Sequence, residues 1–505
     1  MAARVTVSDD SPPGKPWHWW LTLAVIGLAG LPALVFHYLP MTDLPQQLAI
    51  ASIIDQYDNP SFGFAAHYEV VPQLSHALVH GIALGVGKIT SVQFGMSFAA
   101  FLSLLAYPLG VLVLMRAARK PPWLALVAVP LIYHRSVFWG FTSFDLAIGL
   151  ALASFGFHIE PRKSIGRDIA QALLAIAAFT SHVYGLAMLV ALVAGFAAFG
   201  GLRTLGRRYW TLGPLLVGAV LWLVAWQDNA GYGGTVSPPL LLRLEMFTDE
   251  LLGGYQDSSE TVILGLFVAS WSVLAWPALP TSRERLRGLS TLERIAYAAV
   301  VGNLLVYFLA PSSTFTTKHL NFRHAYLAIA FLPLLVRDVS LGRGHFLRRA
   351  LPAIAAGAAT VNAWVHLMAF DREARGFDQV MAALPPAPKV VFLNFDPNGQ
   401  IMRTYPYLHF HGYIQAAKGG LISSSFAQVF WNVPVRVRAD SPLPKSATDF
   451  EWNPMFYNEQ TFGYFYDYAL LRMPHHRVFN ATPAFPFELV LVLPPWQLYK
   501  RIKLP

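Results

Sequence analysis

The chain has 505 residues, of which 55% are hydrophobic and 13% are charged, and its mean hydropathy is +0.44. Soluble domains carry about 25% charged residues, so this composition excludes an ordinary soluble protein and predicts a polytopic membrane protein. The sequence contains no cysteine, which excludes disulfides, thiolate catalysis and cysteine-ligated metals. The net charge of +9 comes with arginines in short loops between apolar runs, a pattern typical of cytoplasmic loops and not of a nucleic-acid-binding protein.

The first segment, residues 1–16, is polar and predicts a cytoplasmic tail. The apolar run that follows, Trp17 to Tyr38, is longer than a signal-peptide core and lacks a small-residue cleavage site, so we expect a retained membrane span. Later arginine-rich loops should lie on the same side of the membrane as the tail. These loops are residues 116–120, 162–167, 203–208, 283–294 and 337–349.

An even number of spans must separate each neighbouring pair of cytoplasmic loops, and this rule divides the ambiguous apolar runs. The run within residues 167–203 must form two short spans with His182 at the outer turn. The run before it must turn within residues 134–140, which brings residues 142–145 near the outer face. Three apolar runs precede the first basic loop, so we expect the weakest, residues 71–86, to lie at the outer interface as an amphipathic or re-entrant helix.

The remaining spans complete the predicted membrane domain. They are expected near residues 212–226, 261–278, 295–310, 325–336 and 350–370. The total is about eleven transmembrane helices, with the N-terminus inside and the C-terminus outside. We therefore predict an α-helical polytopic membrane protein whose transmembrane domain covers residues 17–370 and includes an outer loop at residues 40–91 that contains interfacial helices.

After Phe370 the composition changes and no spanning run follows. Short β-branched or aromatic segments at residues 389–394 and 487–492 predict strands, and residues 413–418 predict a helix. Residues 371–505 are thus expected to form a small extracytoplasmic α/β domain. Aromatic side chains are dense from Phe450 to Tyr468, which suits either an ordinary core or a surface that packs on the membrane or on a glycan.

Side chains that could carry chemistry gather on the predicted outer face. Asp43 follows the first span in Pro40-Met-Thr-Asp43-Leu-Pro45, and a carboxylate at a membrane surface is a functional candidate. Asp145 lies in the second outer region, and His182 lies at the next outer turn. A further group just before a late span contains Lys318, His319, Arg323 and His324.

This arrangement resembles the GT-C superfamily, integral-membrane glycosyltransferases that take a sugar from a polyprenyl-phosphate carrier. The resemblance covers the whole chain in architecture and rests on the motif around Asp43, on Asp145 and on Arg323 before a late span. It implies transfer of a sugar at the outer face of a membrane, with the bilayer and a polyprenyl-phosphate-linked sugar as partners. Many members have two adjacent acids at the first site, whereas Thr42 and Leu44 flank a lone Asp43 here.

In such a reaction Asp43 would act as the base or orient the acceptor hydroxyl. Lys318, Arg323 or His324 would stabilise the leaving phosphate, arginine best because its planar fork matches phosphate oxygens. Asp145 and His182 would bind substrate. No cofactor is required by the sequence, and two carboxylates are few for a Mg²⁺ or Mn²⁺ site, so metal dependence is left open. The other histidines, among them His409 and His411, show no ligand pattern and predict no metal site.

Each assignment has a plainer alternative. Asp43 could cap a helix, Asp145 could complement a helix N-terminus, His182 could be a turn residue, and Arg323 and Lys318 could bind bulk lipid headgroups. At the level of function, the alternatives are a transporter of lipid-linked substrates and a non-catalytic membrane scaffold. The acceptor, which could be a glycan, a lipid or a protein, and the donor sugar are not specified by the sequence. The low lysine count relative to arginine and the high alanine, glycine, leucine and proline content fit a GC-rich bacterial genome. With the predicted topology, we expect a protein of the bacterial inner membrane whose N-terminus is cytoplasmic and whose C-terminal domain is periplasmic.

Overall fold

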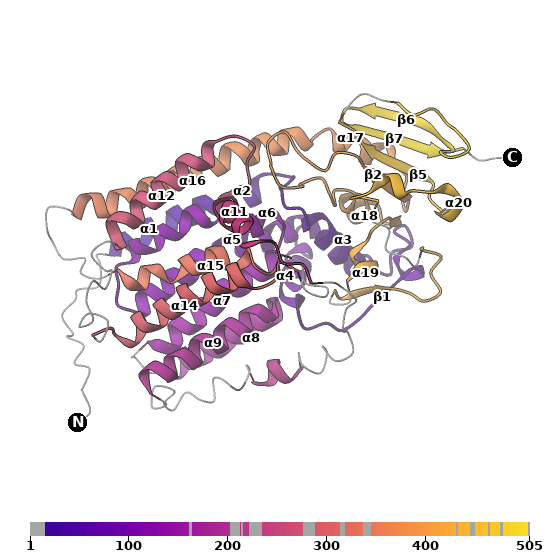
Figure 1. Ribbon diagram of the computed structural model, residues 1–505. Helices are drawn as coiled ribbons and strands as arrows, with labels where there is room; N and C mark the ends of the chain where they lie inside the picture. The colour runs from indigo at the N-terminus through magenta and orange to yellow at the C-terminus, as the bar shows by residue number, and fades with distance from the viewer. Residues whose placement is uncertain are drawn as a thin grey trace.

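The structure is a computed structural model that describes residues 16–160, 164–201, 213, 216–221, 235–275, 288–313, 319–336, 345–430, 433–444, 450–462, 465–474 and 478–502. The helices run side by side in a bundle, and the C-terminal strands lie at one end of it (Figure 1). The described residues leave out the predicted tail and much of the basic loops. They also leave out most of the predicted span at residues 212–226.

The N-terminal part begins with α1 (Pro16–Gly30), which is followed by the short α2 (Pro32–Val35). The predicted first span is divided at Pro32 because proline has no N–H for the helical hydrogen bond and its ring clashes with the preceding turn. The outer loop then contains α3 (Leu44–Asp55), β1 (Tyr68–Val70) and α4 (Ala77–Gly87). The helix predicted at residues 71–86 is therefore present as α4, and it packs along α5 (Val92–Ala117).

The two predicted breaks in the following apolar runs are confirmed. The first run forms the 3-10 segment η2 (Pro122–Leu131) and the short α6 (Arg135–Phe138), turns at Gly140, and continues as α7 (Thr142–Ile159). The next run forms α8 (Ile165–Ser181) and α9 (Val183–Gly200), with His182 as the single residue between them. Prolines at both ends of η2 explain why this buried stretch is not a regular α-helix.

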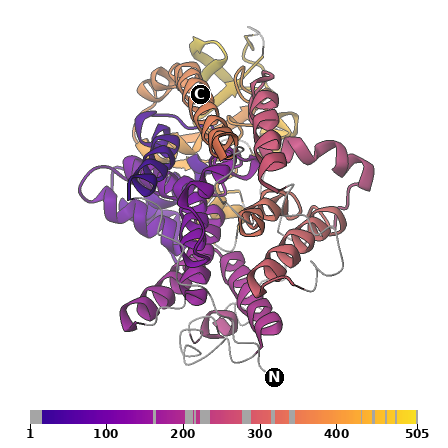
Figure 2. The ribbon, with the colours of Figure 1, turned by 90° about the vertical axis from the view of Figure 1, so that its left-hand side faces the viewer.

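The later helices are α11 (Leu240–Leu252), α12 (Ser259–Ala275), α14 (Thr291–Leu309), α15 (Arg323–Ala330), η6 (Leu332–Leu335) and α16 (His345–Ala374). Seen along the bundle, the N-terminal helices lie mainly on one side and these later helices on the other (Figure 2). In the described part of the chain, five helical stretches are long and apolar enough to cross a membrane by length and composition. They are α5, α7, α9, α14 and the Phe346–Ala383 stretch, and shorter apolar helices accompany them. The protein is an integral membrane protein, and the count of eleven spans stays a prediction.

The C-terminal part contains a mixed five-stranded sheet with strand order β3-β2-β5-β7-β6. The strands are β2 (Lys389–Asn394), β3 (Leu421–Ile422), β5 (Tyr468–Arg472), β6 (Phe487–Leu493) and β7 (Trp496–Arg501). Strand β2 pairs in parallel with β3 and β5, whereas β7 pairs antiparallel with β5 and β6. The predicted strands at residues 389–394 and 487–492 are confirmed as β2 and β6, and the predicted helix as α18 (Gly412–Lys418). The other elements here are α17 (Phe377–Ala383), α19 (Phe426–Val429), β4 (Val435–Val437), η7 (Pro454–Phe456) and α20 (Glu459–Phe462).

The C-terminal part is packed directly onto the outer loop. Strand β1 pairs antiparallel with β4, so that Tyr68 lies opposite Val437. Helices α3 and α18 contact one another, and Ile50 and Phe64 share a buried cluster with Leu421 and Phe426. The two parts thus form one unit at one end of the helix bundle. Helix α16 continues to Ala374, past the predicted boundary at residue 371.

Candidate functional site

Asp43 lies at the start of α3, where the backbone of the α6–α7 turn holds it. The Thr42 N–H donates to the Phe138 carbonyl over 2.9 Å, and the Asp43 N–H donates to the Trp139 carbonyl over 3.1 Å. The turn itself needs Gly140, whose φ is +83° and where a Cβ would lie 2.8 Å from the Asp43 nitrogen. The Asp43 side chain makes no capping hydrogen bond to α3 and is 18% exposed, so its carboxylate is available for another role.

The carboxylate of Asp43 is paired with a histidine from the C-terminal part. Oδ1 of Asp43 lies 3.4 Å from Nε2 of His409, and Nδ1 of His409 lies 2.8 Å from Oε2 of Glu451. Burial disfavours the charged imidazole, but the carboxylates of Glu451 and Asp43 outweigh this effect and raise the pKa of His409 to about 10. His409 is therefore an imidazolium at neutral pH, held between two carboxylates.

Asp145 lies in the first turn of α7 and is buried. Its Oδ1 accepts a hydrogen bond of 3.1 Å from the Tyr326 hydroxyl and lies 3.4 Å from Nε2 of His134. The rings of His134 and Tyr326 are stacked with centroids 3.7 Å apart, which fixes both groups. Within the described residues, Oδ2 of Asp145 is buried and has no hydrogen-bond partner. A buried carboxylate oxygen in this state is suited to receive a donor from a ligand or a water molecule.

Arg323 is the first residue of α15 and is buried inside the protein. Its guanidinium lies over the rings of Phe141, at 4.3 Å, and Phe144, at 4.9 Å. The carboxylates of Asp145 and Asp43 both act electrostatically on it. An arginine that only bound bulk lipid headgroups would be exposed at the surface, so the burial of Arg323 within the electrostatic influence of two carboxylates favours a role in a site.

The remaining predicted site residues lie around this arginine or outside the described chain. Nδ1 of His324 lies 2.7 Å from Oδ1 of Asn303, and its Nε2 contacts the Tyr184 hydroxyl. His182 accepts a hydrogen bond of 3.0 Å from the Tyr184 N–H and so caps α9, as a turn residue does. Its assignment to substrate binding stays a prediction. Lys318 lies outside the described residues.

The structure thus brings Asp43, Asp145 and Arg323 into one electrostatic neighbourhood and adds two residues that the sequence did not single out. His409 was not expected to take part in a site, and Glu451 was not considered. Neither has a local signal, because their partner Asp43 lies at the other end of the chain. Among the residues that the structure describes, no three histidine or acidic side chains meet in an arrangement that could hold a metal ion.

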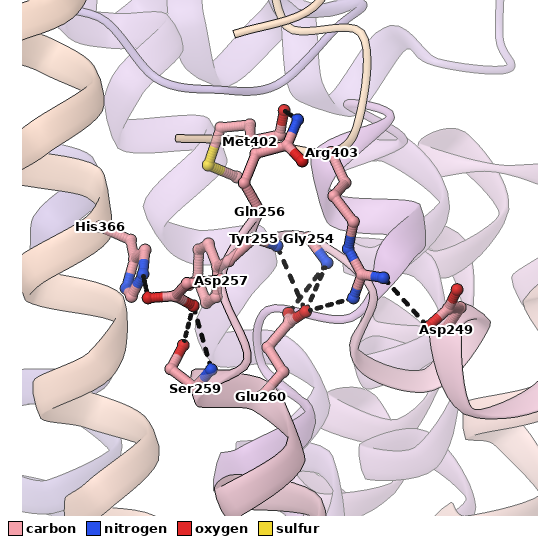
Figure 3. Close-up of polar contacts among 10 residues, drawn as sticks. All are labelled: Asp249, Gly254, Tyr255, Gln256, Asp257, Ser259, Glu260, His366, Met402 and Arg403. Atoms are coloured by element: carbon pink, nitrogen blue, oxygen red, sulfur yellow. Dashed lines mark hydrogen bonds and ion pairs between the residues drawn. The ribbon is translucent and has the colours of Figure 1, made fainter. Parts of the chain in front are cut away.

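A second polar cluster joins the C-terminal part to the helix bundle (Figure 3). Glu260 accepts hydrogen bonds from the backbone N–H groups of Gly254 and Tyr255, and Arg403 donates to it over 3.1 Å. Arg403 also contacts Asp249 at 3.3 Å, and its backbone N–H donates to the Gly254 carbonyl. Nearby, His366 of α16 lies 3.0 Å from Asp257. These polar groups form hydrogen bonds and ion pairs with one another, so we interpret the cluster as a structural junction.

Comparisons with known proteins identify the fold. No protein-family model and no curated protein sequence matches the chain. Solved structures similar to this chain include ArnT from Cupriavidus metallidurans in the apo state, with a TM-score of 0.56 and 12% identity over 96% of this chain and 97% of that chain. They also include the same protein bound to undecaprenyl phosphate, with a TM-score of 0.50 and 14% identity over 96% of this chain and 98% of that chain. This likeness extends over nearly the whole chain, so the chain has the fold of ArnT, and the predicted architecture is confirmed at the level of the fold.

Proposed function

We propose that this protein is an integral-membrane glycosyltransferase that transfers a sugar from a polyprenyl-phosphate donor to an acceptor. The fold supports a lipid-linked donor, because a protein of the same architecture has been solved with undecaprenyl phosphate. The observation that carries the proposal is the convergence of charged groups around Asp43. A partly exposed carboxylate, the imidazolium of His409 and the buried guanidinium of Arg323 come from three distant parts of the chain.

The chemistry assigns one role to each of these groups. The acceptor oxygen attacks the anomeric carbon, the bond from this carbon to the phosphate oxygen breaks, and polyprenyl phosphate leaves with the bonding electron pair. Asp43 takes the hydroxyl proton as a base, or it orients the hydroxyl and the proton passes to the departing phosphate. His409 and Glu451 hold the Asp43 carboxylate in position.

The negative charge that develops on the phosphate needs a cation that is already in place. Arg323 meets this need because its buried guanidinium already packs on two aromatic rings and because its fork of N–H donors matches phosphate oxygens. His324, Asp145 and, outside the described residues, Lys318 are the further candidates for contacts with the substrates. A Mg²⁺ or Mn²⁺ ion is not part of the proposed steps, since the described residues form no ligand set for it.

We place the reaction at the outer face of a bacterial inner membrane, with the N-terminus in the cytoplasm and the C-terminal part in the periplasm. The arginine-rich loops support this orientation. The packing of the outer loop onto the C-terminal part supports it as well, because the two segments predicted to be outside lie at one end of the bundle.

Substitution of Asp43 by Asn tests the proposal. The Asp43→Asn variant should lose sugar transfer from a polyprenyl-phosphate sugar by about 10²- to 10⁴-fold and should still bind undecaprenyl phosphate. Asp55→Asn is the matched control, because Asp55 is an exposed carboxylate at the end of the same helix. A transporter or a scaffold would be little affected by Asp43→Asn, so an unchanged turnover in this variant argues against the enzyme.

A further inference from the structure

Two aromatic residues, Trp139 and Tyr405, are hydrogen-bonded through their backbone to the segment that carries Asp43. The hydroxyl of Thr42 donates to the backbone carbonyl of Tyr405 over 3.2 Å, which ties residue 405 to the start of α3. The Tyr405 ring lies edge-to-face with Trp139, at 5.9 Å, and with Trp452, at 5.2 Å. The Trp139 carbonyl is the acceptor for the Asp43 N–H. The rings of Trp139, Tyr405 and Trp452 therefore pack in a row, and the backbone of the first two is hydrogen-bonded to residues 43 and 42.

Trp452 is an exposed aromatic residue of its segment, as is Phe456, which is 67% exposed. Phe450 is buried, and the rings of Tyr457 and Phe462 pack against it, so the predicted aromatic core is confirmed for these residues. Trp452 is 41% exposed although it is one of the largest apolar side chains. An aromatic ring that remains partly in water, next to another aromatic ring, has surface left to bury against a ligand.

The chain places this exposed ring directly after a buried charge. Glu451, the residue before Trp452, lies 2.8 Å from Nδ1 of His409 and is 9% exposed at its side chain. The same short segment thus supplies a carboxylate to the polar chain from Asp43 to Glu451 and, at the next residue, a partly exposed aromatic ring. Binding sites for small polar molecules commonly combine apolar or aromatic walls with a few placed polar groups.

We propose that Trp452 and Tyr405 bind a pyranose ring of the acceptor, so that the acceptor is a glycan or a glycolipid and not a protein side chain or a simple lipid. This inference rests on the proposed function. A pyranose has a face of C–H groups that packs on an aromatic ring, and its hydroxyls lie around the rim, where charged side chains can accept or donate hydrogen bonds. The acceptor is favoured over the donor sugar because Trp452 belongs to the C-terminal part and is open to solvent, whereas the cation assigned to the lipid phosphate, Arg323, is buried.

Saturation-transfer NMR on the full-length protein in nanodiscs tests this subsite without requiring turnover. The probes are methyl glycosides of glucose, galactose, mannose and arabinose, each at millimolar concentration. At least one of them should receive saturation at its ring C–H protons from the wild-type protein. Trp452→Ala and Tyr405→Ala should weaken that binding by about tenfold, in line with about 1.4 kcal/mol for a lost aromatic contact. Trp452→Phe should restore most of it, because a ring remains.

Two further variants separate this inference from the proposed function. Trp20→Ala is the control for loss of an exposed tryptophan, since Trp20 is 72% exposed on α1, and it should leave glycoside binding unchanged. Asp43→Asn should keep at least part of the binding while it abolishes transfer. The subsite is overturned if no glycoside binds to the wild-type protein or if Trp452→Ala binds as well as the wild type. If instead the glycoside binding depends on Trp452 but Asp43→Asn keeps full transfer activity, the subsite stands and the catalytic role of Asp43 fails.

Discussion

The buried His409 should make the stability of the protein depend on pH in the alkaline range. The pKa of His409 is about 10 in the folded protein and near 6.5 in the unfolded chain. In the folded protein, burial disfavours the charged imidazole, but Glu451 and Asp43 favour it more strongly. Because the folded-state pKa is the higher one, the stabilisation is fully present below pH 6.5 and is lost as the pH rises to about 10. A shift of this size corresponds to a few kcal/mol.

The perturbation that isolates this effect is His409→Gln, which removes the titrating group. Thermal unfolding is followed by intrinsic fluorescence in detergent from pH 6 to pH 10.5 for both proteins. The wild type should unfold at a higher temperature than the variant at pH 6, and this difference should shrink as the pH approaches 10. The difference in unfolding temperature between the two proteins removes the contributions of groups that titrate equally in both.

His411→Gln provides a matched control from the same segment. Burial, followed by the positive charge of His409, lowers the pKa of His411 to about 3, so His411 is neutral in the folded and in the unfolded state above pH 6.5. The difference in unfolding temperature between the wild type and His411→Gln should therefore stay constant over the alkaline range. The reasoning about His409 is refuted if the difference for His409→Gln is equally constant, or if it disappears near pH 6.5.

Three other substitutions test further parts of the account. Arg323→Gln should weaken binding of undecaprenyl phosphate by about 10- to 100-fold, because a charge-assisted hydrogen bond contributes about 1.5–3 kcal/mol. A filter-binding assay measures this affinity. If the variant binds the lipid as well as the wild type, Arg323 does not bind the phosphate. Gly140→Ala should destabilise the protein by about 1–2 kcal/mol, because alanine is strained at the positive φ of this position. It should also reduce turnover, because the new methyl group displaces the backbone of Asp43. An unchanged melting temperature and activity would show that the turn does not hold the site. Arg403→Ala should lower the melting temperature and increase proteolysis between residues 399 and 403, because Glu260 loses its arginine partner. The expected loss of stability is about 1–3 kcal/mol. Equal protease resistance in the variant and the wild type would mean that this ion pair does not stabilise the junction.

Much of the fold could be predicted because its signals are local. The rule of even spans identified the turn at His182 and the break within residues 134–140, and short β-branched segments identified β2 and β6. The 3-10 form of Pro122–Leu131 was not predicted, because its apolar residues fit an α-helix equally well and only the packing of its prolines decides. The pairing of β1 with β4 was missed for a different reason. Three-residue strands far apart in the sequence have no pattern that specifies their partner.

The candidate site was predictable only in part. Asp43, Asp145 and Arg323 could be selected because charged residues next to apolar spans are costly unless they have a role. His409 and Glu451 lie in a segment of ordinary composition, and only the fold brings them to Asp43. Trp452 was part of an aromatic-rich stretch whose members could not be divided into core and surface without the structure.

The central claim is that the lipid phosphate and the reacting carboxylate share one site. The most direct test is a cryo-EM map of the full-length protein in nanodiscs with undecaprenyl phosphate. We predict density for the phosphate against the guanidinium of Arg323, with the lipid chain leading to the bilayer and the carboxylate of Asp43 facing the space beside the phosphate. A phosphate bound away from Arg323, or an Asp43 that faces away from the bound headgroup, would contradict the account.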